Sequence, residues 1–282
     1  MDTNQFRHRL LLKAKDIDCG YVIVKIDNLQ FTGDYYFAYG NFPLNKISKI
    51  IINGEEVPIT KYKTLEPGSY EIIIYYKNLY SCEDMFRHFG VYGDGVNSAR
   101  TIDVSNLNTS HSLSFKHMFG GYINKIEGLE HLNTSHVKDM SNVIDAVSNF
   151  DADLTSWNTS NVTTLQEFWT YYVVSEITPC EILVKGWNVS NVKDTSKFLS
   201  GTHIQTLDLS GWDLSNVENM SRMFNNAFLT TLIMDGPVNQ NANVQDLFGF
   251  NTEEGVFYYN PEHDYSNIIS QLPSTWRSEP IK

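Results

Sequence analysis

One repeated phrase constrains this chain more than any other feature, because a sequence that recurs at a fixed period folds into stacked copies of one small unit. The five clear copies begin at Asn108, Asn133, Asn158, Asn188 and Asp213. These starts differ by 25, 25, 30 and 25 residues, a period typical of a solenoid. Weaker copies end at Phe86 and Phe248, so we expect about seven coils over residues 79–250.

Each unit combines two hydrophobic patterns. Alternating apolar residues, such as Leu207 and Leu209 in TLDLSGW, indicate a short strand with one buried face. After a Ser/Asn-rich turn, residues such as Val217, Met220 and Phe224 follow helical spacing, which predicts one short helix behind each strand. We therefore expect an α+β repeat fold, a leucine-rich-repeat-like solenoid of short strand-helix coils. Its repeated core is expected to contain Trp157, Trp187, Trp212, Met118, Phe119, Phe168, Met220, Met223 and Phe224.

The Ser and Asn residues of the phrase could be read as a functional polar stripe. We interpret them as residues that cap the following helix and satisfy turn amides, since every coil needs both. The members of this stripe are Ser110, Ser135, Ser160, Ser190, Ser215, Asn161, Asn191 and Asn216.

The two ends differ from the repeat. Residues 1–78 contain strand-like runs and an Asn53-Gly54 hairpin signal, which predicts a β-rich unit that either caps the solenoid or docks it to something else. Residues 251–282 are expected to form a C-terminal cap, with Pro261, Pro273 and Pro280 ending any regular ladder. Its aromatic residues should cover the last coil; they are Phe257, Tyr258, Tyr259, Tyr265 and Trp276.

Composition narrows the classes of partner. The 21 basic and 33 acidic residues give a net charge of −12, which argues against a surface that follows nucleic-acid phosphates or anionic lipid. The opening MDTNQFRHRLLLKAKDIDCG is not typical of a signal peptide, and no window approaches the length of a membrane span. Cys19, Cys82 and Cys180 lack zinc-ligand spacing, so we interpret them as buried structural thiols, with an intermolecular disulfide or a reactive thiol as alternatives.

The phrases WNTSNV, WNVSNV and LDLSGWDLSNVENMSRMF resemble the BspA-like leucine-rich repeats of bacterial surface proteins, over roughly residues 79–250. The ending GVFYYNPEHDYSNIISQLPSTW is similar to the closing segment of repeat proteins encoded by gut Bacteroides and their phages. This resemblance implies a solenoid that serves adhesion or display. Surface-attached members carry a secretion signal and an anchoring segment, neither of which is evident here, so the resemblance calls for another route to an exposed surface.

Catalytic signatures are missing from the sequence. It has no GxSxG, GxxxxGK[ST], HExxH or Rossmann glycine motif, so we expect no enzymatic activity, no cofactor and no metal. His111 and His136 occupy equivalent turn positions and would suit a metal pair, but other coils place Asn there, which favours a plain polar turn residue. Asp151 and Asp153 could form a catalytic carboxylate pair; without a second cluster we interpret them as solvated turn acids.

Two insertions are better candidates for specificity. GVYGDGVNSAR, residues 90–100, and TYYVVSEITPC, residues 170–180, both fall between the expected helix and the next strand. Insertions at one point of a repeat emerge on one edge of the solenoid. Tyr92, Tyr171 and Tyr172 are therefore candidate binding residues, the alternative being loops that pack over the adjacent coil.

Together these features predict a non-enzymatic structural or binding protein. We expect a bacteriophage virion-surface or appendage protein, similar to a head fibre, which folds in the host cytoplasm and needs no signal peptide. Its expected partners are other virion or surface proteins and a host-surface glycan or protein, without nucleic acid or membrane insertion, and a homo-oligomer is left open. The alternative is a bacterial cell-surface adhesin or protein-interaction module, and a glycan-active enzyme comes third.

Overall fold

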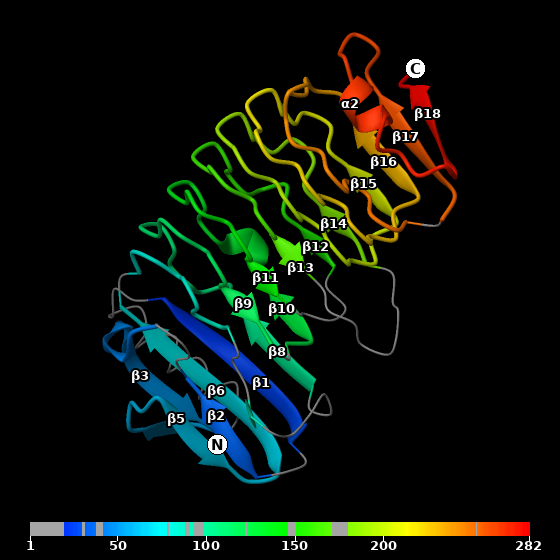
Figure 1. Ribbon diagram of the computed structural model, residues 1–282. Coiled ribbons are helices and arrows are strands. Elements are labelled where there is room, and N and C mark those ends of the chain that lie inside the picture. The colour runs from blue at the N-terminus through cyan, green and yellow to red at the C-terminus, as the bar shows by residue number, and fades with distance from the viewer. Residues whose placement is uncertain are drawn as a thin grey trace.

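The computed structural model describes residues 20–29, 32–37, 42–77, 79–87, 91–92, 99–121, 123–145, 151–170, 180–251 and 253–282. It shows a repeat solenoid with a β-rich unit at its N-terminal end, and the coils follow one another toward the C-terminus (Figure 1). None of the helices in these residues is long and apolar enough to cross a membrane.

The N-terminal unit contains most of a six-stranded sheet in the order β10-β8-β1-β6-β3-β4. The Asn53-Gly54 hairpin prediction is confirmed, because Ile52 of β3 pairs with Glu55 of β4 and both turn residues have positive φ. Strands β8 and β10 belong to the first coils, so this sheet continues from the N-terminal unit into the solenoid. A smaller sheet has the order β5-β2-β7. The elements of this region are β1 (Tyr21–Leu29), β2 (Gly33–Tyr36), the 3₁₀ turn η1 (Leu44–Lys46), β3 (Ile47–Ile52), β4 (Glu55–Val57), β5 (Tyr62–Leu65), β6 (Gly68–Tyr76), β7 (Val91–Tyr92), β8 (Ala99–Asp103) and β10 (Lys125–Glu127).

The coils stack through three parallel ladders. The first joins the short strands predicted from the alternating pattern, in the groups β8-β10, β12-β14 and β15-β16-β17-β18. The second is a series of single-residue bridges that runs from Ser114 to Asn243. The third joins β9, β11 and β13 and begins with a bridge from Phe86 to Phe119. The strands are β9 (Phe119–Gly120), β11 (Ile144–Asp145), β12 (Ala152–Asp153), β13 (Trp169–Thr170), β14 (Ile182–Leu183), β15 (Thr206–Asp208), β16 (Thr231–Met234), β17 (Gly255–Tyr259) and β18 (Trp276–Pro280).

A column of stacked tryptophans forms the centre of the core. The Trp157 and Trp187 ring centroids are 6.2 Å apart with planes 3° apart, and those of Trp187 and Trp212 are 5.7 Å apart with planes 9° apart. Each indole Nε1–H donates to a backbone carbonyl of the preceding coil, so the polar edge of each ring is satisfied. All nine residues expected in the repeated core are at most 4% exposed.

The predicted helices are absent from the described coils, so the α+β assignment is wrong and the repeat is a β-solenoid of about seven turns. Val217, Met220 and Phe224 are buried as their spacing suggests, but Arg222 between them has a φ of 57°, which no right-handed helix tolerates. The equivalent residue is left-handed in the other coils. These residues are Asp84, His117, Asn142, Glu167, Lys197 and Asp246.

The C-terminal prolines do not end the ladder, which is a second correction. Strand β17 pairs with β16, and β18 extends the same parallel sheet to Pro280. Pro261 and Pro273 lie in the connections, and Pro280 is the last residue of an edge strand, where no partner needs its missing N–H. The short helix α2 (Ser266–Ile269) lies between these two strands in the sequence. Phe257, Tyr265 and Trp276 are buried against the end of the core.

Candidate binding surface

The recurrent serines make turns within their own coil. In Ser110, Ser135, Ser160 and Ser190, both the backbone N–H and the hydroxyl donate to the side-chain oxygen of the Asn two residues earlier. This is the turn-amide role expected from the sequence. The helix-capping role is wrong, because the described residues that follow these serines form no helix.

The recurrent asparagines join one coil to the next. Asn161, Asn191 and Asn216 each donate from Nδ2 to the backbone carbonyl of a serine in the preceding coil, at 2.7, 2.7 and 2.9 Å. We call this row of bonds the asparagine ladder. Because these amides are already engaged, the polar stripe holds the scaffold together and offers few free groups to a ligand.

The two histidines at the start of this row lie where the later coils have asparagine. The Nδ1 atoms of His111 and His136 are each 3.1 Å from the serine hydroxyl of their own coil, so the cross-coil bond is replaced by a bond within the coil. Within the described ranges, no three His, Cys, Asp or Glu side chains are placed to hold a metal ion.

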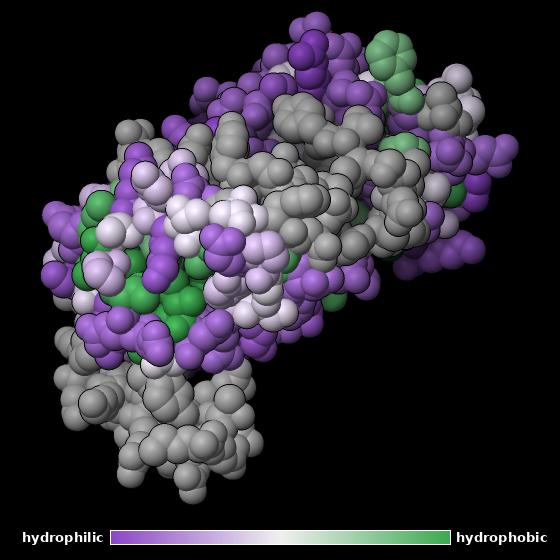
Figure 2. All heavy atoms as spheres, turned by 90° about the horizontal axis from the view of Figure 1, so that it is seen from below, coloured by the Kyte–Doolittle hydropathy of each residue, from purple (hydrophilic) through white to green (hydrophobic). Residues whose placement is uncertain are grey.

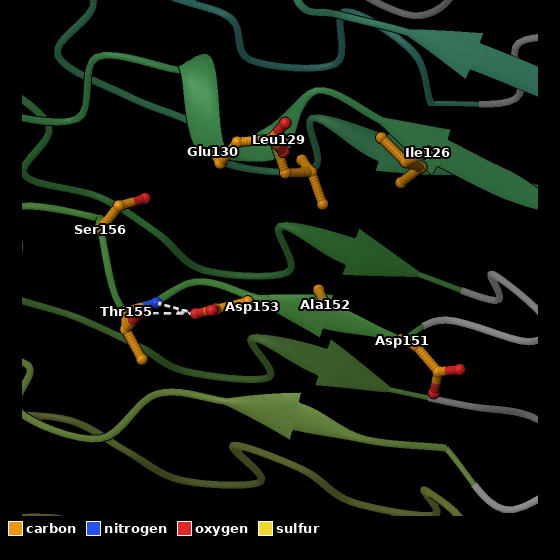
Figure 3. Close-up of a pocket in the computed structure, with 8 residues that line it drawn as sticks. All are labelled: Ile126, Leu129, Glu130, Asp151, Ala152, Asp153, Thr155 and Ser156. Atoms are coloured by element: carbon orange, nitrogen blue, oxygen red, sulfur yellow. Dashed lines mark hydrogen bonds between the residues drawn. The ribbon is translucent and has the colours of Figure 1, made fainter.

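A hollow of about 280 Å³ opens where the first ladder is interrupted between β10 and β12. Asn133 lies six residues after Glu127, whereas Asn108 lies five after Asp103. The longer connection contains the 3₁₀ turn η3 (Leu129–His131). Gly128 before it has a φ of 83° and lies against Ser105, where a side chain would clash. Figure 3 shows the lining residues, which are Ile126, Leu129, Glu130, Asp151, Ala152, Asp153, Thr155 and Ser156.

The two aspartates beside this hollow have separate structural roles. Asp151 accepts a hydrogen bond from the Glu181 N–H of the next coil at 2.7 Å. Asp153 accepts from both the hydroxyl and the N–H of Thr155, and these bonds hold the pKa of Asp153 below its usual value. Figure 3 shows the two carboxylates directed apart. Since a low pKa favours the ionised form, Asp153 is poorly suited to donate a proton as a catalytic acid.

A second hollow of about 530 Å³ lies near the C-terminal end, between the first ladder and the last connections. It contains Lys185 and Asp208, whose Nζ and Oδ2 atoms are 2.8 Å apart. Burial raises the pKa of Asp208, but hydrogen bonds from Lys185 and Ser210 outweigh it and leave this pKa below its usual value. Asp235 accepts from the Gly211 N–H at 2.6 Å, so the charged groups here are also tied into the scaffold.

A third, smaller hollow of about 200 Å³ lies between loops of neighbouring coils and contains Phe228 and Phe250. The surface in Figure 2 is mainly hydrophilic, with its largest hydrophobic area on the side of the N-terminal sheet. Phe250 belongs to the other end of the chain, and this residue is 87% exposed, the most of any large apolar residue in the described part. Neither phenylalanine was selected by sequence reasoning, because both lie outside the repeated phrase.

The inserted loops proposed from the sequence are largely outside the described residues. Tyr171 and Tyr172 both lie outside them. Tyr92 belongs to strand β7, whose residues pair with Asp34 and Tyr35 of β2, so that part of the insertion is a strand rather than a loop. The role of the three tyrosines stays a prediction.

The described cysteines have raised pKa values. Cys82 is fully buried, which raises its thiol pKa to about 12, and burial raises that of the partly buried Cys180 to about 11. Both are free thiols, and Cys19 lies outside the described residues. Because the thiolate is the reactive form, these thiols are poor nucleophiles at neutral pH.

One family model matches the chain, over residues 80–175 and 172–253; its description is "Mycoplasma protein of unknown function, DUF285". The match spans the coils, all lining residues of the first and third hollows, and some of those of the second. No curated protein and no solved structure matches the chain.

Proposed function

The chain belongs to the DUF285 family, whose function is unknown, and from this premise we propose that it is a non-catalytic binding protein built as a rigid display scaffold. The observation that supports this most is the use of the repeated polar groups. The repeated Asn and Ser side chains are hydrogen-bonded within the scaffold, in the asparagine ladder and the serine turns. Exposed apolar groups and hollows occur where the sequence departs from the repeat. A regular scaffold with irregular surface sites is the usual arrangement of binding solenoids.

The finer assignment, a BspA-like leucine-rich-repeat protein that mediates adhesion or display, belongs to the same proposal. Two settings follow from it: the surface of a bacteriophage particle, or the surface of a bacterial cell as an adhesin or interaction module. The family description names Mycoplasma proteins, which supports the bacterial setting. The phage setting rests on the resemblance of the closing segment.

Mass spectrometry separates the two settings. Peptides of this chain in purified phage particles, at a constant copy number per particle, are expected for a virion protein. For a bacterial surface protein, brief protease treatment of intact cells should release the peptides instead. Absence from both samples would overturn the display role.

The non-catalytic part of the proposal has its own test. Incubation of the intact chain with a panel of bacterial polysaccharides should release no reducing ends above a buffer control. Hydrolysis that is lost in the Asp151→Asn or Asp153→Asn variant would instead support a glycan-active enzyme at the hollow between β10 and β12.

A further inference from the structure

The hollow that contains Phe228 and Phe250 combines aromatic and polar groups in a small space. Its volume is about 200 Å³, and it is lined by Asn226, Ala227, Phe228, Phe250, Asn251 and Glu253. Phe228 is 40% exposed and Phe250 is 87% exposed. Removing exposed phenyl rings from water lowers the free energy, so a ligand that covers these two rings is stabilised by the contact.

The backbone that carries the two phenylalanines is tied to the neighbouring coils. Asn226 accepts the Phe250 N–H through Oδ1 at 3.2 Å, and Asn251 donates through Nδ2 to the Leu229 carbonyl at 2.8 Å, so two side-chain bonds tie the neighbouring coils together. On its other side, Phe228 packs against the His203 ring with centroids 4.8 Å apart. Because the backbone at this site is already ordered, binding costs little backbone entropy.

The polar groups of the hollow favour one kind of ligand. Asn226 and Glu253 are both exposed, and the side-chain-mediated bonds they make here use the Asn226 Oδ1 and the Glu253 N–H, which leaves the Asn226 amide nitrogen and the Glu253 carboxylate open to a ligand. They supply a donor and an acceptor beside the two rings. An apolar protein side chain placed here could bond to neither group, whereas sugar hydroxyls can donate and accept.

We propose that this hollow binds one pyranose ring of a glycan, an inference that rests on the proposed role as a binding protein. The polarised C–H groups on the flat face of the sugar lie against the electron-rich face of Phe250, and its hydroxyls bond to Asn226 and Glu253. The volume is below the roughly 300–1,000 Å³ of drug-sized sites, which fits a single ring rather than a buried oligosaccharide.

Saturation-transfer NMR on the intact chain tests the proposal, with free glucose, galactose, mannose and N-acetylglucosamine as probes. Transfer to the ring protons of at least one sugar is expected. Phe250→Ala should weaken binding of that sugar by roughly ten-fold, while Phe250→Tyr should keep it. Tyr80→Ala removes another exposed aromatic side chain, at the opposite end of the solenoid, and is a matched control that should bind like the unmodified chain.

The proposal is overturned if none of the four sugars receives saturation, or if transfer is unchanged in Phe250→Ala. Because the Phe250 side chain is exposed, its loss should leave the fold intact, which the thermal transition of each variant checks. Detection of the chain on particles or cells does not depend on these sugars. A chain that is displayed but does not bind sugar through Phe250 would refute the glycan site and leave the proposed function standing.

Discussion

Single side chains decide how firmly each coil is joined to the next. The asparagine ladder connects the coils that carry Asn161, Asn191 and Asn216, and each bond joins one amide to one carbonyl. The earlier coils have His111 and His136 in this position, and each of these rings bonds to the serine hydroxyl of its own coil. The first coils therefore lack a contact that the later coils have.

Replacing His136 with Asn should extend the asparagine ladder by one bond, to the Ser110 carbonyl. A net gain of about 1 kcal/mol in the free energy of unfolding is expected, the usual contribution of one hydrogen bond. Urea denaturation of the His136→Asn variant measures it. His136→Ala is the control, because it removes the imidazole without supplying an amide, and equal stability of the two variants would contradict the role assigned to the ladder.

A buried tyrosine makes the stability of the C-terminal end depend on high pH. Tyr265 is 2% exposed and donates its hydroxyl to the Gly236 carbonyl at 2.7 Å. Burial, together with the charge of Asp235, raises its pKa to about 12. The folded chain thus holds this proton more tightly than the unfolded chain, whose tyrosines ionise near pH 10.

The raised pKa of Tyr265 contributes stability to the folded chain. This contribution is fully present below about pH 10 and is lost as the pH rises toward 12. In the Tyr265→Phe variant one such group is missing, so the loss of unfolding free energy between pH 10 and pH 11.5 should be smaller by about 1.5 kcal/mol. Guanidinium denaturation at pH 8, 10 and 11.5 provides the comparison. At pH 8 the variant should be less stable by about 1 kcal/mol, because it lacks the hydrogen bond. Parallel pH curves for the two chains would show that Tyr265 does not control this dependence.

The element that differs most from expectation is the segment behind each strand, which is a turn instead of a helix. A side-chain oxygen at the second ladder accepts the N–H two residues later, as Asn219 does from Ser221, and the next residue, Arg222, is left-handed. A β-branched residue is strongly disfavoured in that conformation, whereas Asn tolerates it. Asn142 fills the same position in another coil.

Arg222→Val is therefore expected to destabilise the chain by about 1–2 kcal/mol relative to Arg222→Asn. Both variants lose the surface ion pair with Asp246, so that effect cancels in the comparison. Thermal and urea unfolding of the two variants measure the difference. If the segment were helical, Val and Asn would differ little there, because their helix propensities are similar.

The strands and the buried positions could be predicted from the sequence, since period-2 alternation and the spacing of Trp, Met and Phe report burial directly. The turn could not, because burial at Val217, Met220 and Phe224 is the same whether the chain coils as a helix or turns through Arg222. In the described coils the left-handed position never holds glycine. Four of its seven residues are Asp, Asn or His, which tolerate the conformation, but the other three are Glu, Lys and Arg, so the compositional signal is weak. The hollow beside β10 is marked in the sequence by the extra residue before Asn133.

At the scale of the whole molecule, each coil contacts only its neighbours, and stability is a sum over coils and the interfaces between them. The tryptophan column crosses the middle of this array, and Trp187 contacts the rings on both sides. The N-terminal sheet, β10 to β4, and the C-terminal sheet, β15 to β18, each have hydrogen bonds of their own. The central coils are thus the part on which cooperative unfolding depends.

Trp187→Ala should separate the array into two blocks that unfold independently. The ring is 1% exposed, and its removal is expected to cost about 3–5 kcal/mol, a large part of the stability of an ordinary domain. Because that loss falls on the interfaces at the centre, the two ends of the variant should unfold at different urea concentrations. The unmodified chain is expected to unfold in one transition. Hydrogen exchange followed by mass spectrometry, at increasing urea, assigns each transition to its peptides.

Trp187→Phe, which keeps an aromatic ring in the column, should retain a single transition. A single transition in Trp187→Ala as well would mean that the coils are coupled by more than their nearest neighbours.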